Sequence, residues 1–293
     1  MRHPAVHALL AFGLWGLMPL YIRQLAGVPA MEVLLQRSAW ALVFLLAVLA
    51  ALGRLAWLRE VARQPRLLAR FAVSALLLSV NWLVYIVAVQ EGHVVEASLG
   101  YFINPLFSVV LGVLVLKERL TTPQWVAVAL AAAGVAWLGW LVGRPPWIAL
   151  TLAASFGLYG LMRKTAALGA LEGLTLETLL MAPLVLPALA WWTWQHGGVF
   201  TQGNPVLLGW LLLAGPMTAL PLLFFGAAAR GMPLATLGMF QYLSPTLQLL
   251  LGVFAFGEPF DPQRLIGFAL IWSALALVSA DALRRAGGAP PAS

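Results

Sequence analysis

The sequence predicts an all-α integral membrane protein with ten transmembrane helices, arranged as two inverted five-helix repeats. The first observation is composition: the chain of 293 residues is 62% hydrophobic and only 9% charged, with a mean hydropathy of +0.92. A soluble domain carries about 25% charged residues. The second observation is a series of long apolar segments. The third is a short sequence motif that occurs, nearly unchanged, near the start of each half of the chain.

Ten apolar segments have about the length that crosses a hydrocarbon core some 30 Å thick. They lie at roughly 5–25, 31–52, 71–90, 94–116, 123–142, 147–163, 175–195, 205–228, 233–256 and 263–282. Turn residues, mostly glycine and proline, separate them at 27–29, 144–146, 203–205, 231–233 and 258–262. The opening run MRHPAVHALLAF has no small-residue cleavage site ahead of another span, so we interpret it as part of the first helix.

The two halves of the chain contain matching segments. FGLWGLM at 12–18 corresponds to FGLYGLM at 156–162, and LFSVVLGVLVLKE at 106–118 corresponds to TLQLLLGVFAFGE at 246–258. In this register Trp15 matches Tyr159, and the apolar runs that Glu32 and Glu177 open also match. Self-similarity at half the chain length indicates a duplicated architecture.

The duplication predicts a first repeat over residues 1–143, a second over 144–285 and a disordered tail over 286–293. Five spans in each repeat place the two repeats upside down relative to each other. This inverted arrangement is typical of secondary transporters.

The distribution of basic residues predicts that both termini are cytoplasmic. With the N-terminus inside, the outer side receives only Arg23, Arg37, Arg144 and Arg264. The inner side receives Arg2, Arg54, Arg59, Arg63, Arg66, Arg70, Lys117, Arg119, Arg163, Lys164, Arg230, Arg284 and Arg285. Positive residues concentrate on the cytoplasmic side of membrane proteins, and ten spans return the chain to the side where it began.

Polar residues within the apolar segments are the candidates for function, because a charge near the centre of a membrane helix costs about 2.5–3.5 kcal/mol. His93, Glu96, Gly100 and Asn104 share one face of the fourth segment, and Asn104 precedes Pro105. In the ninth segment Gln241, Ser244 and Gln248 form a matching stripe, and Ser244 precedes Pro245. Two polar, proline-broken helices at equivalent repeat positions predict a substrate site near the membrane midplane. The alternative is that these side chains only hydrogen-bond between helices.

Glu96 has two interpretations that the sequence leaves open. It lies near the outer end of its helix, where it could bind an amine-bearing solute or take up a proton with His93 beside it. It could equally be a hydrated carboxylate that hydrogen-bonds across helices.

Other segments add aromatic and charged candidates. Asn81, Trp82 and Tyr85 could supply flat walls and fixed polar groups for a small ligand. Arg37 is costly unless it is paired or hydrated, so it is either a substrate or gating contact or part of a structural ion pair. Trp15 either lines the cavity or packs between helices. The predicted substrate-binding residues are Trp15, Arg37, Asn81, Trp82, Tyr85, Glu96, Tyr101, Asn104, Gln241, Tyr242, Ser244 and Gln248.

Glu118 and Glu258 close the fourth and ninth segments, and we interpret both as structural residues at helix ends. A ladder of small residues that includes Ala127 and Ala131 suits close helix packing, and it leaves a homodimer open.

Several classes of protein are disfavoured. The chain has no cysteine, its four histidines are scattered, and it has no GxSxG run, so we expect neither an enzyme nor a metal or cofactor site. A channel or lipid scramblase would carry polar faces along whole helices, whereas the polarity here is confined to short stretches. The expected partners are a small-molecule substrate and the lipid bilayer, and no nucleic acid.

Four sequence runs carry a resemblance to a known family: EVLLQRSAW at 32–40, NWLVYIVAVQEGHVVEASLGYFINPL at 81–106, KTAALGALEGLTLETLL at 164–180 and LGMFQYLSPTLQLLLGVFAFGEP at 237–259. Together they resemble the RarD group within the EamA branch of the drug/metabolite transporter superfamily. The resemblance implies ten transmembrane helices in two EamA repeats, the bacterial inner membrane, and export or exchange of a small organic solute or drug. It also implies a cavity between the repeats, lined by the first four helices of each, with the fifth and tenth at the periphery.

Overall fold

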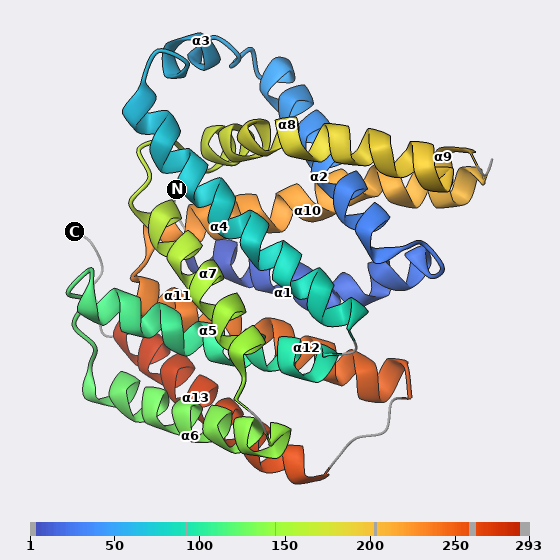
Figure 1. Ribbon diagram of the computed structural model, residues 1–293. Coiled ribbons are helices and arrows are strands. Elements are labelled where there is room, and N and C mark those ends of the chain that lie inside the picture. Colours follow the sequence, from blue (N-terminus) through green and yellow to red (C-terminus); the bar gives the residue numbers. More distant parts are fainter. Residues whose placement is uncertain (1–3, 92, 144, 202–203, 258–261, 288–293) are drawn as a thin grey trace.

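The computed structural model describes residues 4–91, 93–143, 145–201, 204–257 and 262–287, and throughout these ranges the regular structure is helical (Figure 1). The helices are α1 (Pro4–Ile22), α2 (Ala30–Ala51), α3 (Trp57–Val61), α4 (Pro65–Gln90), α5 (Val94–Leu114), α6 (Thr122–Val142), α7 (Trp147–Lys164), α8 (Ala170–His196), α9 (Gly198–Thr201), α10 (Pro205–Gly231), α11 (Leu234–Gln241), α12 (Leu243–Leu250) and α13 (Pro262–Gly287).

Nine helical stretches within the described ranges are long and apolar enough to cross a membrane, which confirms a multi-pass membrane protein. The tenth predicted segment, 147–163, corresponds to α7. This helix has only 18 residues, and its last turn carries Arg163 and Lys164, which lower its hydropathy. It is nevertheless packed among α4, α5 and α10 in the centre of the bundle. The expected count of ten therefore depends on one short, largely buried helix.

The two proline-containing helices differ from each other. The ninth predicted segment is interrupted: α11 ends at Gln241, α12 begins at Leu243, and a π-helical turn (Leu251–Ala255) completes the span. The interruption lies where Pro245 withholds a hydrogen bond from the carbonyl group of Gln241. By contrast, α5 stays helical through Pro105, so the prediction of two broken helices is correct only for the second repeat.

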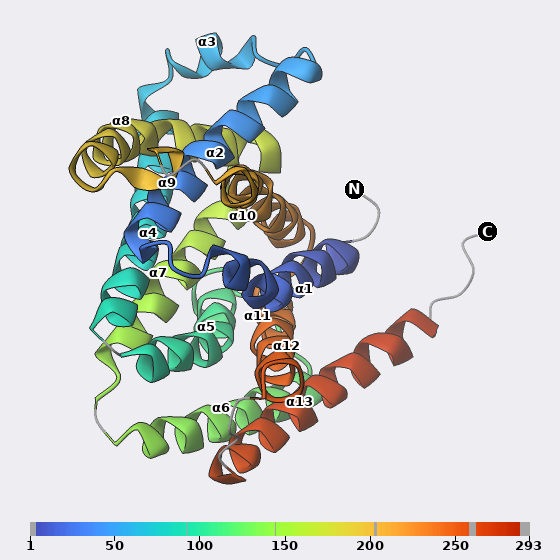
Figure 2. The ribbon, with the colours of Figure 1, turned by 90° about the vertical axis from the view of Figure 1, so that its right-hand side faces the viewer.

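Contacts between helices occur in matched pairs, as expected for two repeats. Helix α1 packs on α10 and α4 packs on α7, while α5 packs on α7 and α1 packs on α11 and α12. The pair α2–α10 similarly matches α8–α4. The fifth helix of each repeat, α6 and α13, lies beside its counterpart at the edge of the bundle (Figures 1 and 2).

A close crossing holds α6 against α13. A side-chain carbon on Gly134 would lie 2.7 Å from the carbonyl oxygen of Gly267, so only glycine fits there. Across the same contact, Leu138 lies against Gly267. Small residues at such positions let membrane helices approach closely enough for their backbones to touch.

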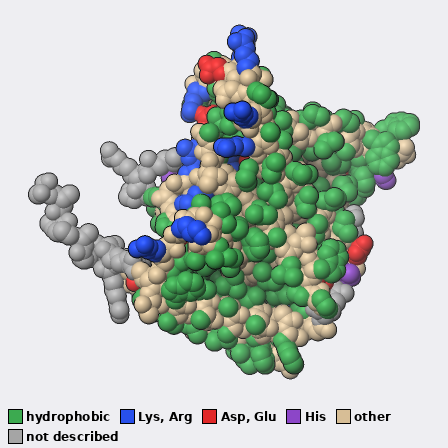
Figure 3. All heavy atoms as spheres, turned by 60° about the vertical axis from the view of Figure 1, so that its left-hand side comes forward, with side chains coloured by type: hydrophobic (Ala, Val, Ile, Leu, Met, Phe, Trp, Pro, Cys, Tyr) green, Lys and Arg blue, Asp and Glu red, His purple; other side chains and the backbone are tan. Residues whose placement is uncertain are grey.

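One end of the bundle is strongly basic, and we call it the basic end. It carries the α2–α4 connection with α3, and it lies at the upper left in Figure 1, with α3 at the top. Its basic residues include Arg54, Arg59, Arg63, Arg66 and Arg70. Figure 3 shows Lys and Arg side chains gathered along it. Helices α1 and α4 run from this end towards the opposite end, which carries the α1–α2 and α4–α5 connections.

Candidate functional site

Five side chains from four helices lie close together in the half of the bundle that is farther from the basic end. We call them the Arg37 cluster: Arg37 on α2, Trp82 and Tyr85 on α4, Tyr101 on α5 and Thr218 on α10. The Nε of Arg37 donates a hydrogen bond to the Thr218 hydroxyl at 3.2 Å. The guanidinium carbon of Arg37 lies 4.8 Å from the centre of the Trp82 ring, a cation–π contact. The cluster therefore contains four residues predicted from the sequence and one, Thr218, that was not.

The two tyrosine side chains of the cluster are partly exposed, although both are on membrane-spanning helices. Their rings lie edge to face with centres 6.1 Å apart, and they are 37% and 43% exposed. On α4, Tyr85 lies two residues from Leu83 and from Val87, which places it about 200° around the helix from these exposed apolar side chains. On α5, Tyr101 is nine residues, or about 180°, from the exposed Val110. The exposed tyrosine surface thus faces away from the outward apolar stripes and into the bundle.

Charge and aromatic surface are combined in this cluster. The guanidinium of Arg37 lies within electrostatic range of the hydroxyl groups of Tyr85, Tyr101 and Tyr21. A narrow hollow of about 10 Å³ lies between α2, α4 and α8, and Trp82 lines it together with Ser38, Leu42, Thr178 and Met181. Trp82 therefore touches both the cation and an apolar space. Such a combination can bind a small solute that has a flat or apolar body and a polar group.

Four predicted residues make hydrogen bonds that join helices. Asn81 donates to the carbonyl oxygen of Leu152 at 2.9 Å and to the Ser155 hydroxyl at 3.0 Å, which joins α4 to α7. These contacts satisfy the side-chain amide of Asn81.

The polar stripe of the ninth span, Gln241, Ser244 and Gln248, also forms hydrogen bonds between helices. Gln241 donates to the Ser108 hydroxyl on α5 at 3.0 Å. Ser244 donates to the carbonyl oxygen of Phe12 at 2.7 Å, and Gln248 donates to that of Trp15 at 3.0 Å, both on α1. These contacts match the alternative interpretation, hydrogen bonding between helices, and they lie apart from the contacts of the Arg37 cluster.

Three further predicted residues are packed in the interior. Trp15 contacts the rings of Phe12, Phe156 and Phe225. Asn104 and Tyr242 are buried, and within the described chain the Asn104 side-chain oxygen and the Tyr242 hydroxyl have no hydrogen-bond partner. The substrate-binding roles of all these residues stay predictions.

Glu96 is buried, and its carboxylate accepts a hydrogen bond from the backbone N–H of Ile148 at 2.8 Å. Ile148 is in the first turn of α7, whose N-cap residue Pro146 provides no side-chain cap. The carboxylate thus supplies an acceptor and a negative charge where a helix N-terminus favours both. His93 precedes α5 as its N-cap residue, and its Nδ1 lacks a partner within the described chain. The proton role predicted for these two residues stays a prediction.

Two other glutamates bind helix starts in the same manner. Glu118 accepts from the backbone N–H groups of Leu234 and Ala235 at 2.7 and 2.9 Å, at the start of α11. Glu32 accepts from Val199 at 2.7 Å, at α9. These contacts agree with the structural interpretation of Glu118, while Glu258 lies outside the described residues.

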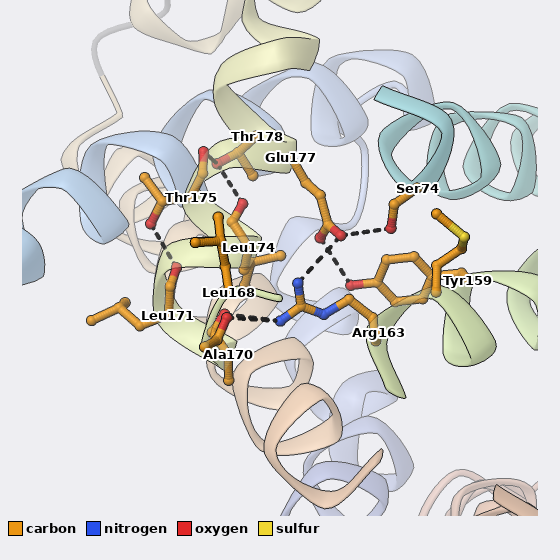
Figure 4. A network of polar contacts seen from close by, with 12 residues as sticks. Ser74, Tyr159, Arg163, Leu168, Ala170, Leu171, Leu174, Thr175, Glu177 and Thr178 are labelled. Atoms are coloured by element: carbon orange, nitrogen blue, oxygen red, sulfur yellow. Dashed lines mark hydrogen bonds and ion pairs between the residues drawn. The ribbon is translucent and has the colours of Figure 1, made fainter. Parts of the chain in front are cut away.

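A buried polar network lies towards the basic end and joins α4, α7 and α8 (Figure 4). At its centre the Glu177 carboxylate accepts from Ser74 at 2.6 Å and from Tyr159 at 3.2 Å. It also forms an ion pair with Arg163 at 3.4 Å. The other terminal nitrogen of Arg163 donates to the carbonyl oxygen of Ala170 at 3.1 Å. We call this set the Glu177 network.

This network was not predicted from the sequence. The charge pattern predicts Arg163 among the basic residues of the inner side, whereas the structure buries that side chain to 1% exposure. The available signal was the correspondence of Glu177 with Glu32 and of Tyr159 with Trp15, which marked both positions as parts of the repeat. Their partners could not be read from sequence, because Ser74 is 103 residues away from Glu177.

The chain is similar to known proteins over nearly its whole length. The profile of the EamA-like transporter family matches residues 4–140. A Pseudomonas aeruginosa protein described as a transporter is 47% identical over 97% of this chain and 95% of its own length. Protein RarD of Streptomyces exfoliatus is 48% identical over 94% of this chain and 88% of its own length.

A solved crystal structure shares the fold. It superposes with a TM-score of 0.73 over 97% of this chain and 99% of its own, at 20% identity. With an apolar multi-helix bundle, these similarities identify a membrane transporter in general terms. The chain therefore belongs to the EamA-like transporter family, in its RarD-like group.

Proposed function

We propose that this protein is a secondary transporter that exports or exchanges a small organic solute by alternating access between its two repeats. The observation that carries the proposal is an asymmetry along the bundle. The tyrosines of the Arg37 cluster are 37% and 43% exposed, while Glu177 and Arg163 are 0% and 1% exposed. Accessible aromatic side chains towards one end and a buried ion pair towards the other fit one state of an alternating-access cycle.

The Arg37 cluster is the proposed substrate site. It combines a cation, a hydroxyl group and three aromatic rings, and it draws on helices from both repeats: α2, α4 and α5 from the first, and α10 from the second. Rocking of one repeat against the other would therefore change the site itself. Asn104 and Tyr242 extend it on the proposed path, since each carries a buried polar atom without a partner in the described chain.

The Glu177 network is the proposed barrier on the other side of the site. It fastens α7 and α8 of the second repeat to α4 of the first. We place it on the cytoplasmic side of a bacterial inner membrane, because the adjoining basic end fits the positive-inside rule. In this orientation the N- and C-termini are cytoplasmic.

Flux into proteoliposomes tests the proposal. The purified protein is reconstituted and offered radiolabelled organic acids, amines, amino acids and chloramphenicol, with and without a pH gradient. We expect saturable flux of at least one compound. This flux should be lost in Arg37→Ala and Tyr85→Ala and retained in Ser273→Ala, whose hydroxyl donates to the carbonyl oxygen of Ala269 within α13, at the edge of the bundle. Flux that does not saturate, or that is unchanged in both cluster variants, would contradict it. Lipid scrambling without solute flux would favour a scramblase.

A further inference from the structure

Within the described residues no carboxylate pairs with the charge of Arg37, and this points to the chemistry of the solute. The ion pairs of the described chain are Arg54–Glu172, Arg163–Glu177 and Lys164–Glu118, and none involves Arg37. Arg37 lies seven residues inside α2, where an unpaired charge is costly. Of the two roles that the sequence leaves open for Arg37, a structural ion pair and a substrate contact, the described residues supply no carboxylate for the first.

The guanidinium is held in one orientation by groups that leave its outer edge free. Thr218 accepts from Nε, and the Trp82 ring lies against its face. The two terminal nitrogens donate no hydrogen bond to the described part of the chain, yet neither is sealed from solvent. This free edge is a planar fork of donors whose geometry matches the two oxygens of a carboxylate.

We propose that the transported solute carries a carboxylate, and that Arg37 binds it through its two terminal nitrogens. The proposal rests on the proposed function and names its substrate class. Arg37 repels a cation that lacks an acidic group, so simple amines are poor substrates.

The surroundings of Arg37 also define the rest of the solute. Trp82 also lies beside the apolar side chains of Leu42 and Met181, with which it lines a narrow hollow. Tyr85 and Tyr101 present partly exposed rings on the other helices of the cluster. A carboxylate bound at Arg37 would have aromatic and apolar surface within reach, so the solute is a small organic acid with a flat or apolar body.

Matched acid and amide pairs isolate the contribution of the carboxylate. The full-length protein in detergent is titrated with benzoate and benzamide, phenylacetate and phenylacetamide, and indole-3-acetate and indole-3-acetamide. Binding is measured by calorimetry and by the shift in melting temperature. We expect at least one acid to bind about tenfold or more tightly than its amide, the effect of one charge-assisted hydrogen bond.

Three variants assign the preference to Arg37. Arg37→Gln should abolish it, and Arg37→Lys, which keeps the charge and loses the fork, should retain part of it. Arg23→Gln is the matched control, because Arg23 makes the same type of contact with the ring of Phe256, at 4.9 Å, outside the cluster. This control should keep the full preference. Circular dichroism and gel filtration establish that each variant is folded.

The proposal is overturned if no acid binds more tightly than its amide in the natural protein, or if folded Arg37→Gln keeps the preference. Flux of the same compounds separates this result from a failure of the proposed function. An acid that binds at Arg37 and is not transported argues against transport and leaves the anion site standing. Flux of amides or amines without any preference for acids would support transport and argue against the anion site at Arg37.

Discussion

Arg163 and Glu177 form an ion pair at 3.4 Å in which the two side chains are 1% and 0% exposed. Removing one partner of a buried pair leaves an uncompensated charge, at a cost of about 3–5 kcal/mol. A second ion pair near the same end, Arg54–Glu172, has 56% of the Arg54 side chain exposed. Exposed pairs contribute only about 0–1 kcal/mol. Removing one partner from each pair therefore distinguishes the effect of losing a buried ion pair from the effect of losing an exposed one.

We expect Glu177→Gln to open the bundle towards the basic end. The chain has no cysteine, so a single cysteine replacing the buried Leu174 reports accessibility directly. Labelling with a membrane-impermeant maleimide should be slow in the otherwise natural chain and about tenfold or more faster when Glu177→Gln is added.

Glu172→Gln is the control for this experiment and should leave the labelling rate unchanged. Cysteine in place of Arg59, exposed on α3, should react at the same rate in every background. An unchanged rate at position 174 in a folded Glu177→Gln variant would show that the network does not hold this end closed.

Two buried tyrosines should respond oppositely to loss of the hydroxyl group. Tyr159 and Tyr242 are both 0% exposed. The hydroxyl of Tyr159 donates to Glu177, whereas that of Tyr242 has no partner in the described chain. Tyr159→Phe should lower the free energy of unfolding by about 1–2 kcal/mol, and Tyr242→Phe should leave it unchanged or raise it by up to about 1 kcal/mol.

Chemical denaturation in detergent measures both values. Equal losses of stability would mean that Tyr242 has a partner in solution, such as bound water.

Removing the carboxylate of Glu118 should destabilise the start of α11. This carboxylate accepts from both Leu234 and Ala235, where Pro233 offers no side-chain cap. Glu118→Ala should lower stability by about 1–2 kcal/mol, as expected for loss of a helix cap. Glu60→Ala, at an exposed position on α3, is the control and should change stability by less than about 0.5 kcal/mol. An equally small loss of stability in Glu118→Ala would show that the Glu118 carboxylate does not stabilise the start of α11.

A methyl group at Gly134 should force α6 and α13 apart. Its carbon would lie 2.7 Å from the carbonyl oxygen of Gly267, which belongs to a backbone that cannot rotate away. Gly139 is on the same helix, and a methyl group there would meet nothing closer than 3.8 Å. Gly134→Ala should therefore lower the melting temperature, and Gly139→Ala should not.

Because α6 and α13 form the edge of the bundle, ligand binding in the folded fraction of Gly134→Ala should be retained. Loss of binding at unchanged stability would place this pair in the transport machinery.

Much of the architecture follows from sequence because hydrophobic length and duplication are local or periodic signals. The segments at 31–52 and 123–142 match α2 and α6 to within one residue at each end. The segment predicted from 71 in fact begins at Pro65, because its first turns extend beyond the apolar core and carry Arg66 and Arg70.

The site was harder to predict, because a polar residue on a membrane helix does not reveal its partner. Asn104 and Ser244 occupy equivalent repeat positions, yet Ser244 hydrogen-bonds to Phe12 whereas the side-chain oxygen of Asn104 has no partner in the described chain. Glu96 has the spacing of a functional stripe, and its carboxylate accepts a hydrogen bond at the start of another helix, 52 residues away. Arg37 and Trp82 were predicted by residue type and membrane depth, and only the folded chain places one against the other.

Glu32 and Glu177 open matching runs in the two halves of the sequence, and they have different surroundings. Glu177 binds a serine, a tyrosine and an arginine, whereas Glu32 binds the N–H group of Val199. In the proposed alternating-access cycle, two identical halves would give the open-in and open-out forms equal free energy, with no preferred resting state. Unequal contacts at these two glutamates contribute to a free-energy difference between the two forms. We therefore expect the empty protein to populate mainly one form, with the side nearer the basic end closed.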